Sequence, residues 1–215
     1  MICYIFTGGQ VYADSMASLG LERSDGDLVI AADSGYLTAK KLGVKPDLLL
    51  GDLDSLDQSQ LDAGELDALE KKIVPPIKDD TDTQLAVDTA ILRGADEIVI
   101  IGGLGGRLDH TLSSVFLLET IAERGVRCMM TDGRNRVRVM RGGETLRVMR
   151  SAYRYLSLIS LCDVCTGVYI RGVFYPLDNV ELSRKYSYAV SNEITADQAE
   201  ISLGSGVMLV IESRD

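Results

Sequence analysis

Two aspartates follow the apolar run Leu48–Leu50 at a spacing that could bind a cation. Asp52 and Asp54 stand two residues apart, and in an extended chain such residues point to the same side, roughly 7 Å apart. Two carboxylates so placed repel each other unless a cation or a proton lies between them. Mg²⁺ is bound by one or two carboxylates together with water and substrate phosphates. The alternative is that Asp54 or Ser55 caps a following helix while Asp52 lies in a turn.

A second acidic cluster lies at the start of a predicted helix, where Asp79, Asp80 and Asp82 fall close together. An acidic residue near a helix N-terminus is stabilised by the helix dipole, so capping is the simpler interpretation of any one of them. Three aspartates exceed what a cap requires. A role in catalysis or binding therefore stands beside capping as a hypothesis for this cluster.

A glycine-rich segment, Gly102–Gly106, precedes Arg107 and another predicted helix. Glycine-rich backbone can direct its N–H groups at a phosphate, the helix adds its positive end, and an arginine can bind phosphate through two hydrogen bonds. The segment matches neither the P-loop nor the dinucleotide-binding fingerprint. His110, the single histidine of the chain, is a candidate general base or, equally, a structural residue on the helix face.

The chain around these segments alternates between apolar runs and helical patterns. Short apolar runs predict buried strands at Ile2–Phe6, Leu28–Ala32, Leu48–Leu50, Ile98–Ile101 and Val126–Met130. Helical patterns predict helices at Leu37–Leu42, Gln58–Lys72, Thr83–Arg93 and Leu108–Arg124. This alternation indicates βαβ units and an α/β domain with a mainly parallel sheet and helices on both faces.

The glycine-rich and acidic segments come directly after predicted strands. They are Thr7–Gly9, Asp33–Gly35, Gly51–Ser55 and Gly102–His110. In open parallel sheets, ligands bind outside the carboxyl ends of the strands, and all four segments fall on that edge. Any one of them could be a turn, but the four together predict a binding site there.

The pattern changes near residue 133. Beyond Asp132-Gly133 apolar and polar residues alternate, as in Leu156–Leu161 and Glu200–Leu203, and turn residues recur. Residues 1–133 carry 11 basic and 23 acidic side chains, a net charge of −12, whereas residues 134–215 carry 11 and 9, a net charge of +2. We predict an α/β domain over residues 1–133 and an antiparallel β-sandwich or barrel over residues 134–215.

The composition argues against several classes of protein. A net charge of −10 disfavours binding to nucleic-acid backbones, and no apolar run is long enough for a membrane-spanning helix. The first ten residues lack the basic segment of a secretory signal, and four cysteines in 215 residues do not form a disulfide framework. We therefore expect a cytoplasmic protein. Cys162-x-x-Cys165 has no second pair of ligands, which favours two small strand residues over a zinc site.

In combination, these segments resemble the thiamine pyrophosphokinase (thiamine diphosphokinase) family. The resemblance covers nearly the whole chain, and its specificity comes from the order and spacing of many short pieces. These pieces are Asp33-Ser34-Gly35, Pro46-Asp47, Gly51-Asp52-Leu53-Asp54-Ser55, Lys78-Asp79-Asp80-Thr81-Asp82, Gly105-Gly106-Arg107-Leu108-Asp109-His110, Tyr155–Leu161, Gly172-Val173-Phe174-Tyr175-Pro176-Leu177 and Val190-Ser191-Asn192-Glu193. One departure is that some members carry a tryptophan near the C-terminus, whereas this chain has none.

The resemblance implies transfer of the pyrophosphoryl group of ATP to the thiamine hydroxyl, giving thiamine diphosphate and AMP. It implies an α/β domain that binds ATP and Mg²⁺, a thiamine-binding β-sandwich, and a homodimer whose thiamine site is shared between subunits. The resemblance implies that the catalytic residues are Asp52, Asp54, Asp82 and Arg107, and that the three aspartates also bind Mg²⁺. It implies that the residues around the nucleotide are Asp33, Gly35, Thr81, Gln84, Arg107, Asp109 and His110. It also implies that the residues toward thiamine are Asp79, Ser191 and Asn192.

Two alternative functions follow from the same residues. One is an ATP-dependent kinase or pyrophosphokinase acting on another small alcohol, and the other is a non-catalytic sensor of thiamine or nucleotide. The residues alone do not distinguish attack at the β-phosphorus from attack at the γ-phosphorus, nor do they assign a general base among the carboxylates.

Overall fold

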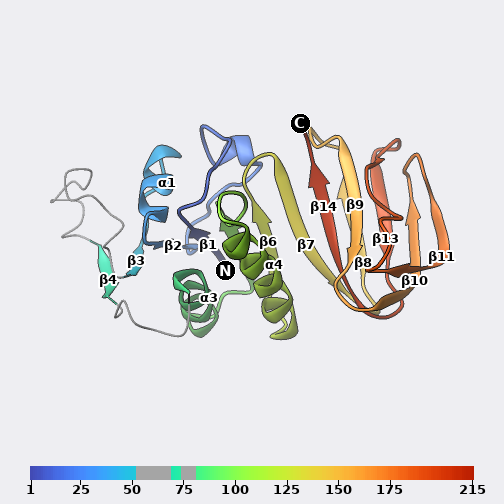
Figure 1. Ribbon diagram of the computed structural model, residues 1–215. Helices are drawn as coiled ribbons and strands as arrows, with labels where there is room; N and C mark the ends of the chain where they lie inside the picture. The colour runs from blue at the N-terminus through green and yellow to red at the C-terminus, as the bar shows by residue number, and fades with distance from the viewer. Residues whose placement is uncertain (52–68, 74–80) are drawn as a thin grey trace. The chain divides into compact units, whose positions relative to one another are not determined.

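The computed structural model describes residues 1–51, 69–73 and 81–215 (Figure 1). The chain divides into two compact units, Met1–Gly133 and Arg134–Asp215, called here the N-unit and the C-unit.

The N-unit is built on a parallel sheet. In the part of the chain that the structure describes, its strand order is β6-β5-β1-β2-β3-β4, and every neighbouring pair runs parallel. The strands are β1 (Ile2–Phe6), β2 (Leu28–Ala32), β3 (Leu48–Gly51), β4 (Glu70–Ile73), β5 (Glu97–Ile101) and β6 (Arg127–Thr131). The helices are the 3-10 turn η1 (Ala17–Leu19), α1 (Gly35–Lys41), α3 (Asp82–Leu92) and α4 (Leu108–Glu123).

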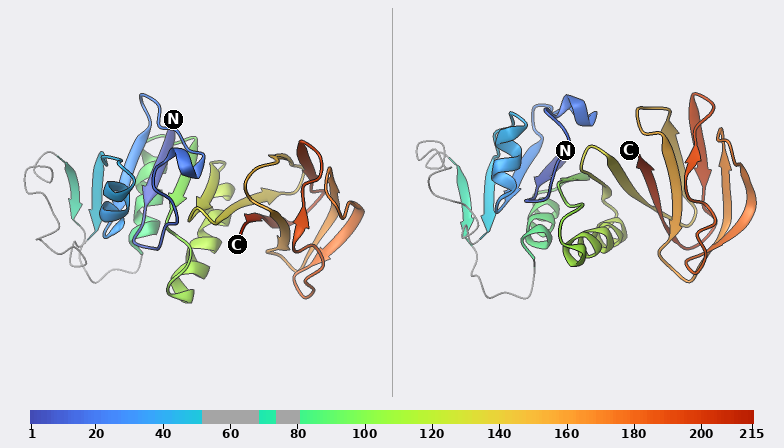
Figure 2. Two further views of the ribbon diagram at one scale, coloured as in Figure 1. Left: turned by 90° about the horizontal axis from the view of Figure 1, so that it is seen from above. Right: turned by 45° about the horizontal axis from the view of Figure 1, so that its top comes forward.

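Helices cover both faces of this sheet (Figures 1 and 2). On one face Ala39 of α1 packs in a core with Val99 and Met129, which pair in register across β5 and β6. Successive strand residues point to opposite faces, so Cys128 points to the other face, where its thiol donates to the carbonyl oxygen of Leu118 in α4. The predicted fold class, a mainly parallel sheet with helices on both faces, is confirmed.

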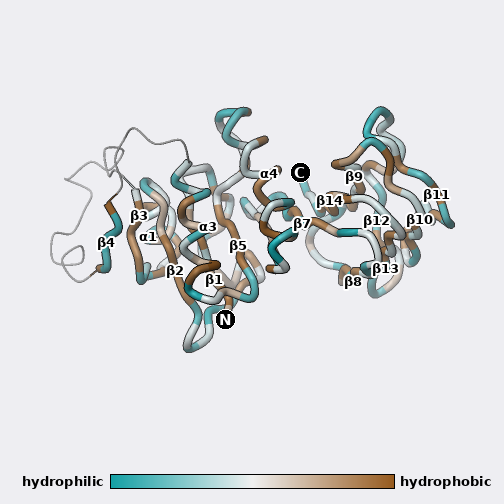
Figure 3. Tube along the Cα trace, turned by 90° about the horizontal axis from the view of Figure 1, so that it is seen from below, coloured by the Kyte–Doolittle hydropathy of each residue, from teal (hydrophilic) through white to brown (hydrophobic). Residues whose placement is uncertain are grey.

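Hydropathy follows position in the sheet. The central strands β1, β2 and β5 are brown in Figure 3, as expected for strands buried on both faces. Their residues from the second onward are buried, whereas all four residues of β4 are exposed.

The helix predicted over Gln58–Lys72 is wrong at its C-terminal end. Glu70–Ile73 form strand β4, which pairs parallel with β3, while residues 58–68 lie outside the described residues. Because every side chain of β4 is exposed, its sequence carries no apolar periodicity that could indicate a strand. Pairing with the open edge of β3 decides its conformation, since backbone N–H and C=O groups require partners.

The C-unit is a β-sandwich of two antiparallel sheets. One has the order β12-β9-β14-β7 and the other β11-β10-β13-β8, with antiparallel pairing throughout. The strands are β7 (Asn135–Arg141), β8 (Thr145–Met149), β9 (Tyr155–Ser160), β10 (Val164–Arg171), β11 (Leu177–Ser183), β12 (Asn192–Glu193), β13 (Gln198–Ser202) and β14 (Val207–Ser213). Both sheets contribute to one core, as Leu158 and Met208 of the first and Val168 and Ile201 of the second illustrate.

Within the described ranges, none of the helices combines the length and the apolar character that a membrane span requires.

Candidate active site

At the carboxyl edge of the N-unit sheet, neighbouring chain segments meet without room for side chains. A Cβ on Gly9, after β1, would lie 1.9 Å from the carbonyl oxygen of Gly102, after β5. A Cβ on Gly35, at the start of α1, would lie 2.0 Å from the carbonyl oxygen of Phe6. Both clashes are with backbone atoms, so no other residue fits there without moving the chain. Glycine is required because it allows the strand ends to come together.

A cavity of about 640 Å³ opens at this edge. Its lining comes from the ends of three strands and from the beginnings of α3 and α4. The lining residues are Thr7–Gly9, Ala32–Ser34, Thr81–Thr83, Gly102, Gly103, Gly105–Arg107, His110 and Ser114. A helix N-terminus presents unpaired backbone N–H groups and a partial positive charge, which favours anions. Two helix N-termini and a glycine-rich loop on one cavity fit a polyphosphate.

Asp33 turns the chain from β2 into α1 at this cavity. Its φ of 46° lies in the left-handed region, which aspartate tolerates better than most residues. Its N–H donates to the carbonyl oxygen of Leu50 at 2.8 Å, and its carbonyl oxygen accepts from Tyr36 at 3.1 Å. A Cβ on Gly51 would lie 1.7 Å from Asp33 Oδ1, so the carboxylate rests against the backbone at the end of β3.

Thr81 and Gln84, both predicted to lie around the nucleotide, have different surroundings at the start of α3. Thr81 caps the helix, its side-chain oxygen accepting from the N–H of Gln84 at 3.2 Å, and this cap places Thr81 and Asp82 on the cavity. The side-chain amide of Gln84 instead donates to Asp88 at 3.1 Å, and Asp88 is also ion-paired to Arg124. Gln84 does not appear in the cavity wall.

Arg107 and Asp109 form an exposed two-point ion pair at the start of α4. Arg107 Nη2 lies 2.6 Å from Asp109 Oδ2, and Nε lies 3.1 Å from Oδ1. The hydrogen bonds from Arg107 lower the pKa of the Asp109 carboxyl to about 2. Asp109 Oδ1 also accepts from the backbone N–H of His110 at 3.0 Å. The guanidinium lines the cavity, but its fork of donors is turned to Asp109, which a phosphate would have to displace.

Among the predicted nucleotide and catalytic residues, the structure brings Asp33, Thr81, Asp82, Arg107 and His110 together around the cavity. Gly35 packs against the backbone at the end of β1, and Asp109 is ion-paired with Arg107, which lines the cavity. Asp52, Asp54 and Asp79 lie outside the described residues.

Ser191 and Asn192 lie in the C-unit and differ in what their side chains do. Asn192 is buried, and its amide oxygen accepts from the N–H of Tyr175 and from that of Glu193, both at 3.0 Å. Its amide nitrogen donates to the carbonyl oxygen of Tyr175 at 2.8 Å. Ser191 has φ 59°, is exposed, and anchors its N–H on the Ser157 hydroxyl at 3.0 Å. Asn192 thus holds the loop in place, while the Ser191 side chain is presented to solvent.

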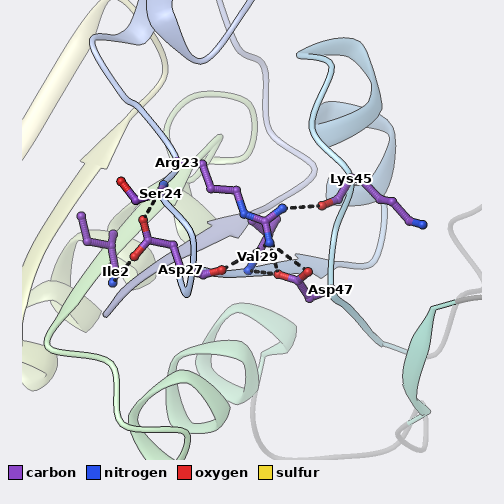
Figure 4. A network of polar contacts seen from close by, with 7 residues as sticks. All are labelled: Ile2, Arg23, Ser24, Asp27, Val29, Lys45 and Asp47. Atoms are coloured by element: carbon purple, nitrogen blue, oxygen red, sulfur yellow. Dashed lines mark hydrogen bonds and ion pairs between the residues drawn. The ribbon is translucent and has the colours of Figure 1, made fainter.

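At the opposite edge of the N-unit sheet, where the strands begin, other aspartates form hydrogen bonds that hold the strands together (Figure 4). Asp47, in the Pro46-Asp47 piece of the family resemblance, binds Arg23 Nη2 through both carboxylate oxygens, at 2.9 and 2.7 Å. The second oxygen also accepts from the N–H of Val29 at 2.8 Å. Arg23 Nη1 in turn donates to the carbonyl oxygen of Lys45 at 3.2 Å. Asp47 therefore joins the beginnings of β2 and β3 and lies at the edge away from the cavity.

Asp27 does the same for β1. One carboxylate oxygen accepts from the N–H of Ile2 at 2.8 Å and the other from the N–H of Ser24 at 2.9 Å. The pKa of the Asp27 carboxyl is lowered, and the hydrogen bond from the backbone N–H of Ser24 is the largest cause. Asp96 is paired with the amino terminus at 2.6 Å, and that bond lowers the pKa of its carboxyl.

Sequence reasoning missed four hydroxyl residues of the cavity: Thr7, Ser34, Thr83 and Ser114. Thr7 and Ser34 stood inside segments that the sequence did single out. Ser114 lies four residues after His110, and residues at that spacing share one face of a helix. Helical spacing from His110 could therefore have identified it.

Comparison with known proteins gives one consistent answer. A family model described as "Thiamin pyrophosphokinase, catalytic domain" matches residues 21–130, and one described as "Thiamin pyrophosphokinase, vitamin B1 binding domain" matches residues 144–208. The chain is 29% identical over 188 residues to the thiamine pyrophosphokinase of Bacillus subtilis (strain 168), covering 87% of this chain and 88% of that protein.

Solved structures agree over the full length. A crystal structure of thiamine pyrophosphokinase from Bacillus subtilis has a TM-score of 0.88 at 26% identity and covers 100% of both chains. A crystal structure of thiamin pyrophosphokinase from Geobacillus thermodenitrificans has a TM-score of 0.84 at 29% identity, covering 100% of this chain and 98% of that one.

Proposed function

The chain belongs to the thiamin pyrophosphokinase family, and we propose that it transfers the pyrophosphoryl group of ATP to the hydroxyl of thiamine. The products are thiamine diphosphate and AMP. The single observation that carries the proposal is the cavity of about 640 Å³ at the carboxyl edge of the N-unit sheet, lined by two helix N-termini, a glycine-rich loop and Arg107. We place the reaction in the cytoplasm, as the cysteine content leads us to expect.

The triphosphate is proposed to bind along the glycine-rich loop. The N–H groups of Gly105 and Gly106 and the N-terminus of α4 supply donors for phosphate oxygens. Arg107 leaves Asp109 and turns its fork onto a phosphate, which it can bind through two parallel hydrogen bonds. Both partners of the resting pair are largely exposed, at 73% and 65% of their side chains, so the exchange has a small cost.

The carboxylates of the cavity suit Mg²⁺. Asp82 provides hard oxygen donors on the same cavity as the phosphate-binding groups, which is the donor type that Mg²⁺ prefers. We propose that Asp82, Asp52 and Asp54 hold the metal, the last two from outside the described residues. When bound, Mg²⁺ neutralises phosphate charge.

The chain's own residues then position the reactants. Asp33 is fixed by its backbone hydrogen bonds to Leu50 and Tyr36, and we propose that it contacts the nucleotide. Thr81 holds the first turn of α3 so that Asp82 faces the cavity. Transfer of a phosphoryl-type group depends mainly on positioning and charge neutralisation, which is the work that this set of residues can do.

We propose that thiamine binds to the loop around Ser191. The exposed Ser191 side chain is available to a ligand, whereas Asn192 keeps the loop in place through Tyr175. Replacing Ser191 by alanine should therefore raise the KM for thiamine with kcat and the KM for ATP little changed. Replacing Asn192 by alanine should also lower the unfolding temperature, since buried donors and acceptors lose their partners.

The thiamine site is proposed to be shared between the two subunits of a homodimer. Complementation tests this directly: an Asp52→Asn chain of low kcat is mixed with a Ser191→Ala/Asn192→Ala chain of raised thiamine KM, under conditions of subunit exchange and at thiamine concentrations far below that KM, where neither chain alone turns over at an appreciable rate. Partial return of activity supports a shared site. Exchange of subunits, observed by native mass spectrometry without any return of activity, would refute it.

The proposed reaction is tested by incubating the chain with ATP, thiamine and Mg²⁺ and measuring the product masses. Thiamine diphosphate and AMP are expected in equal amounts. Thiamine monophosphate with ADP would indicate attack at the γ-phosphorus. Tight binding of thiamine in calorimetry without any turnover would indicate a sensor instead of an enzyme.

A further inference from the structure

The Cys162-x-x-Cys165 pair plays no part in the proposed function, yet the C-unit holds its two thiols in contact. Their Sγ atoms lie 3.6 Å apart. Cys162 follows β9 and is partly exposed, whereas Cys165 in β10 is fully buried. The other two cysteines, Cys3 and Cys128, are buried in the N-unit on β1 and β6, with β5 between those strands.

The surroundings of the two sulfurs consist of hydrogen-bond acceptors. The Ser160 hydroxyl donates its own hydrogen to the carbonyl oxygen of Cys162 at 2.7 Å, and its oxygen lies 3.2 Å from Cys165 Sγ and 3.6 Å from Cys162 Sγ. The carbonyl oxygen of Val207 accepts from Cys165 at 3.2 Å, and that of Val164 accepts from Cys162 at 3.2 Å. Both cysteines are free, so the resting form of the pair is a dithiol.

We propose that Cys162 and Cys165 are a reversible dithiol–disulfide site that reacts with small disulfides such as glutathione disulfide. Exposure and proximity carry this assignment: Cys162 is partly exposed, and the buried Cys165 lies in contact with it. A thiol–disulfide exchange needs one accessible thiolate to attack and a neighbouring thiol to resolve the mixed disulfide.

The reaction balances in two steps. Cys162 loses its proton to solvent and its thiolate attacks one sulfur of glutathione disulfide, whose S–S bond breaks and releases one glutathione thiolate. Cys165 then loses its proton and attacks Cys162 Sγ, which breaks the mixed disulfide and releases the second glutathione thiolate. Two protein thiols are oxidised, and one glutathione disulfide is reduced to two glutathione molecules.

The two cysteines have different roles in this scheme. Burial raises the pKa of the Cys165 thiol to about 11, so its thiolate is scarce at neutral pH and the closing step should accelerate as the pH rises. Closure also brings the sulfurs from 3.6 Å to about 2.05 Å and removes the thiol donors of the Val207 and Val164 carbonyl oxygens. Ser160 lines a hollow of about 80 Å³ between β9 and the chain after β11, so oxidation reaches the wall of that hollow.

The test exposes the full chain to excess glutathione disulfide at pH 8, blocks remaining thiols with N-ethylmaleimide and measures intact mass and peptides. The native chain is expected to lose two thiols and two hydrogens, with a link between Cys162 and Cys165 that dithiothreitol reverses. Cys165→Ser should retain one glutathione on Cys162. Cys162→Ser should lose its remaining thiols at least about tenfold more slowly, because its other cysteines are buried.

Cys128→Ala is the matched control and should oxidise as the native chain does. The proposal is overturned if the native chain keeps four free thiols under conditions that glutathionylate Cys165→Ser. It is equally overturned if the mixed disulfide persists on the native chain, or if the link maps to Cys3 or Cys128. The native-chain measurement decides these outcomes even where a variant fails to fold, as judged by circular dichroism.

Discussion

The N-unit sheet carries aspartates at both of its edges, and the two edges use them differently. At the amino ends of the strands, Asp27 and Asp47 accept backbone N–H groups and Asp47 binds Arg23, while Asp96 binds the amino terminus. At the carboxyl ends, Asp33 and Asp82 line a cavity together with glycine backbone and two helix N-termini. The same residue type therefore joins strands at one edge and lines a cavity at the other. Substitutions at the two edges should separate stability from activity.

The largest effect is expected from Asp82→Asn at the carboxyl edge. Loss of one metal-binding carboxylate should lower kcat at least about 100-fold, roughly 2.7 kcal/mol of transition-state stabilisation, with little change in unfolding temperature. Steady-state kinetics with thiamine and ATP measures this. Asp88→Asn, on the same helix but away from the cavity, is the control and should keep near-normal kcat. A near-normal kcat in Asp82→Asn would refute its assignment.

A smaller loss is expected from Arg107→Gln at the same edge. Removing the guanidinium fork should lower kcat/KM for ATP about 30-fold, roughly 2 kcal/mol, and Arg107→Lys should recover only part of it because lysine cannot bind phosphate through a planar fork. Arg93→Gln, whose native partner is Glu70 on β4, serves as the control. If Arg107→Lys were as active as the native chain, charge alone would explain the role of Arg107.

At the amino edge, Asp47→Ala should affect stability instead of turnover. It leaves the N–H of Val29 without its acceptor and removes the ion pair with Arg23. We expect a loss of about 1–2 kcal/mol in unfolding free energy, since the group is partly exposed. Urea unfolding followed by circular dichroism measures it. Asp96→Ala, which removes a more exposed pair, should cost less. A tenfold fall in kcat of folded Asp47→Ala would contradict the separation of the two edges.

The smallest effect concerns Asp109, which is charged and paired but exposed. Its pKa is about 2 because of Arg107, and in Arg107→Gln it should rise toward the ordinary value of about 3.9. A carboxyl with a depressed pKa contributes stability that is present above its unfolded pKa and is lost as the pH falls through the folded pKa. This contribution is therefore confined to strongly acidic conditions. Carbon-13 NMR titration of the carboxyl groups is the measurement, and an unchanged midpoint in the variant would show that Arg107 does not set it.

The sequence by itself determined the layout of the N-unit and the edge on which its site lies. Apolar runs marked β1, β2, β3 and β5 to within one residue, because strands buried on both faces must be apolar throughout. In a parallel sheet each connecting segment returns the chain to the same side, so the residues directly after each strand fall on one edge. Asp33 and Arg107 could be assigned to that edge from chain order, whereas Thr81 and Asp82 were assigned to the site only through the family resemblance.

The tertiary structure alone decided which side chains are already occupied. Asn192 bonds to Tyr175, 17 residues away, and Asp47 bonds to Arg23, 24 residues away. Neither pairing leaves a pattern in the local sequence. Because of these pairings, Asn192 and Asp47, which belong to the family resemblance, have structural roles. The strand at Glu70–Ile73 depends in the same way on the open edge of β3. The periodicity of apolar residues indicates which side chains face the core. A polar contact depends instead on where a distant part of the chain has folded, and only the assembled sheets fix that position.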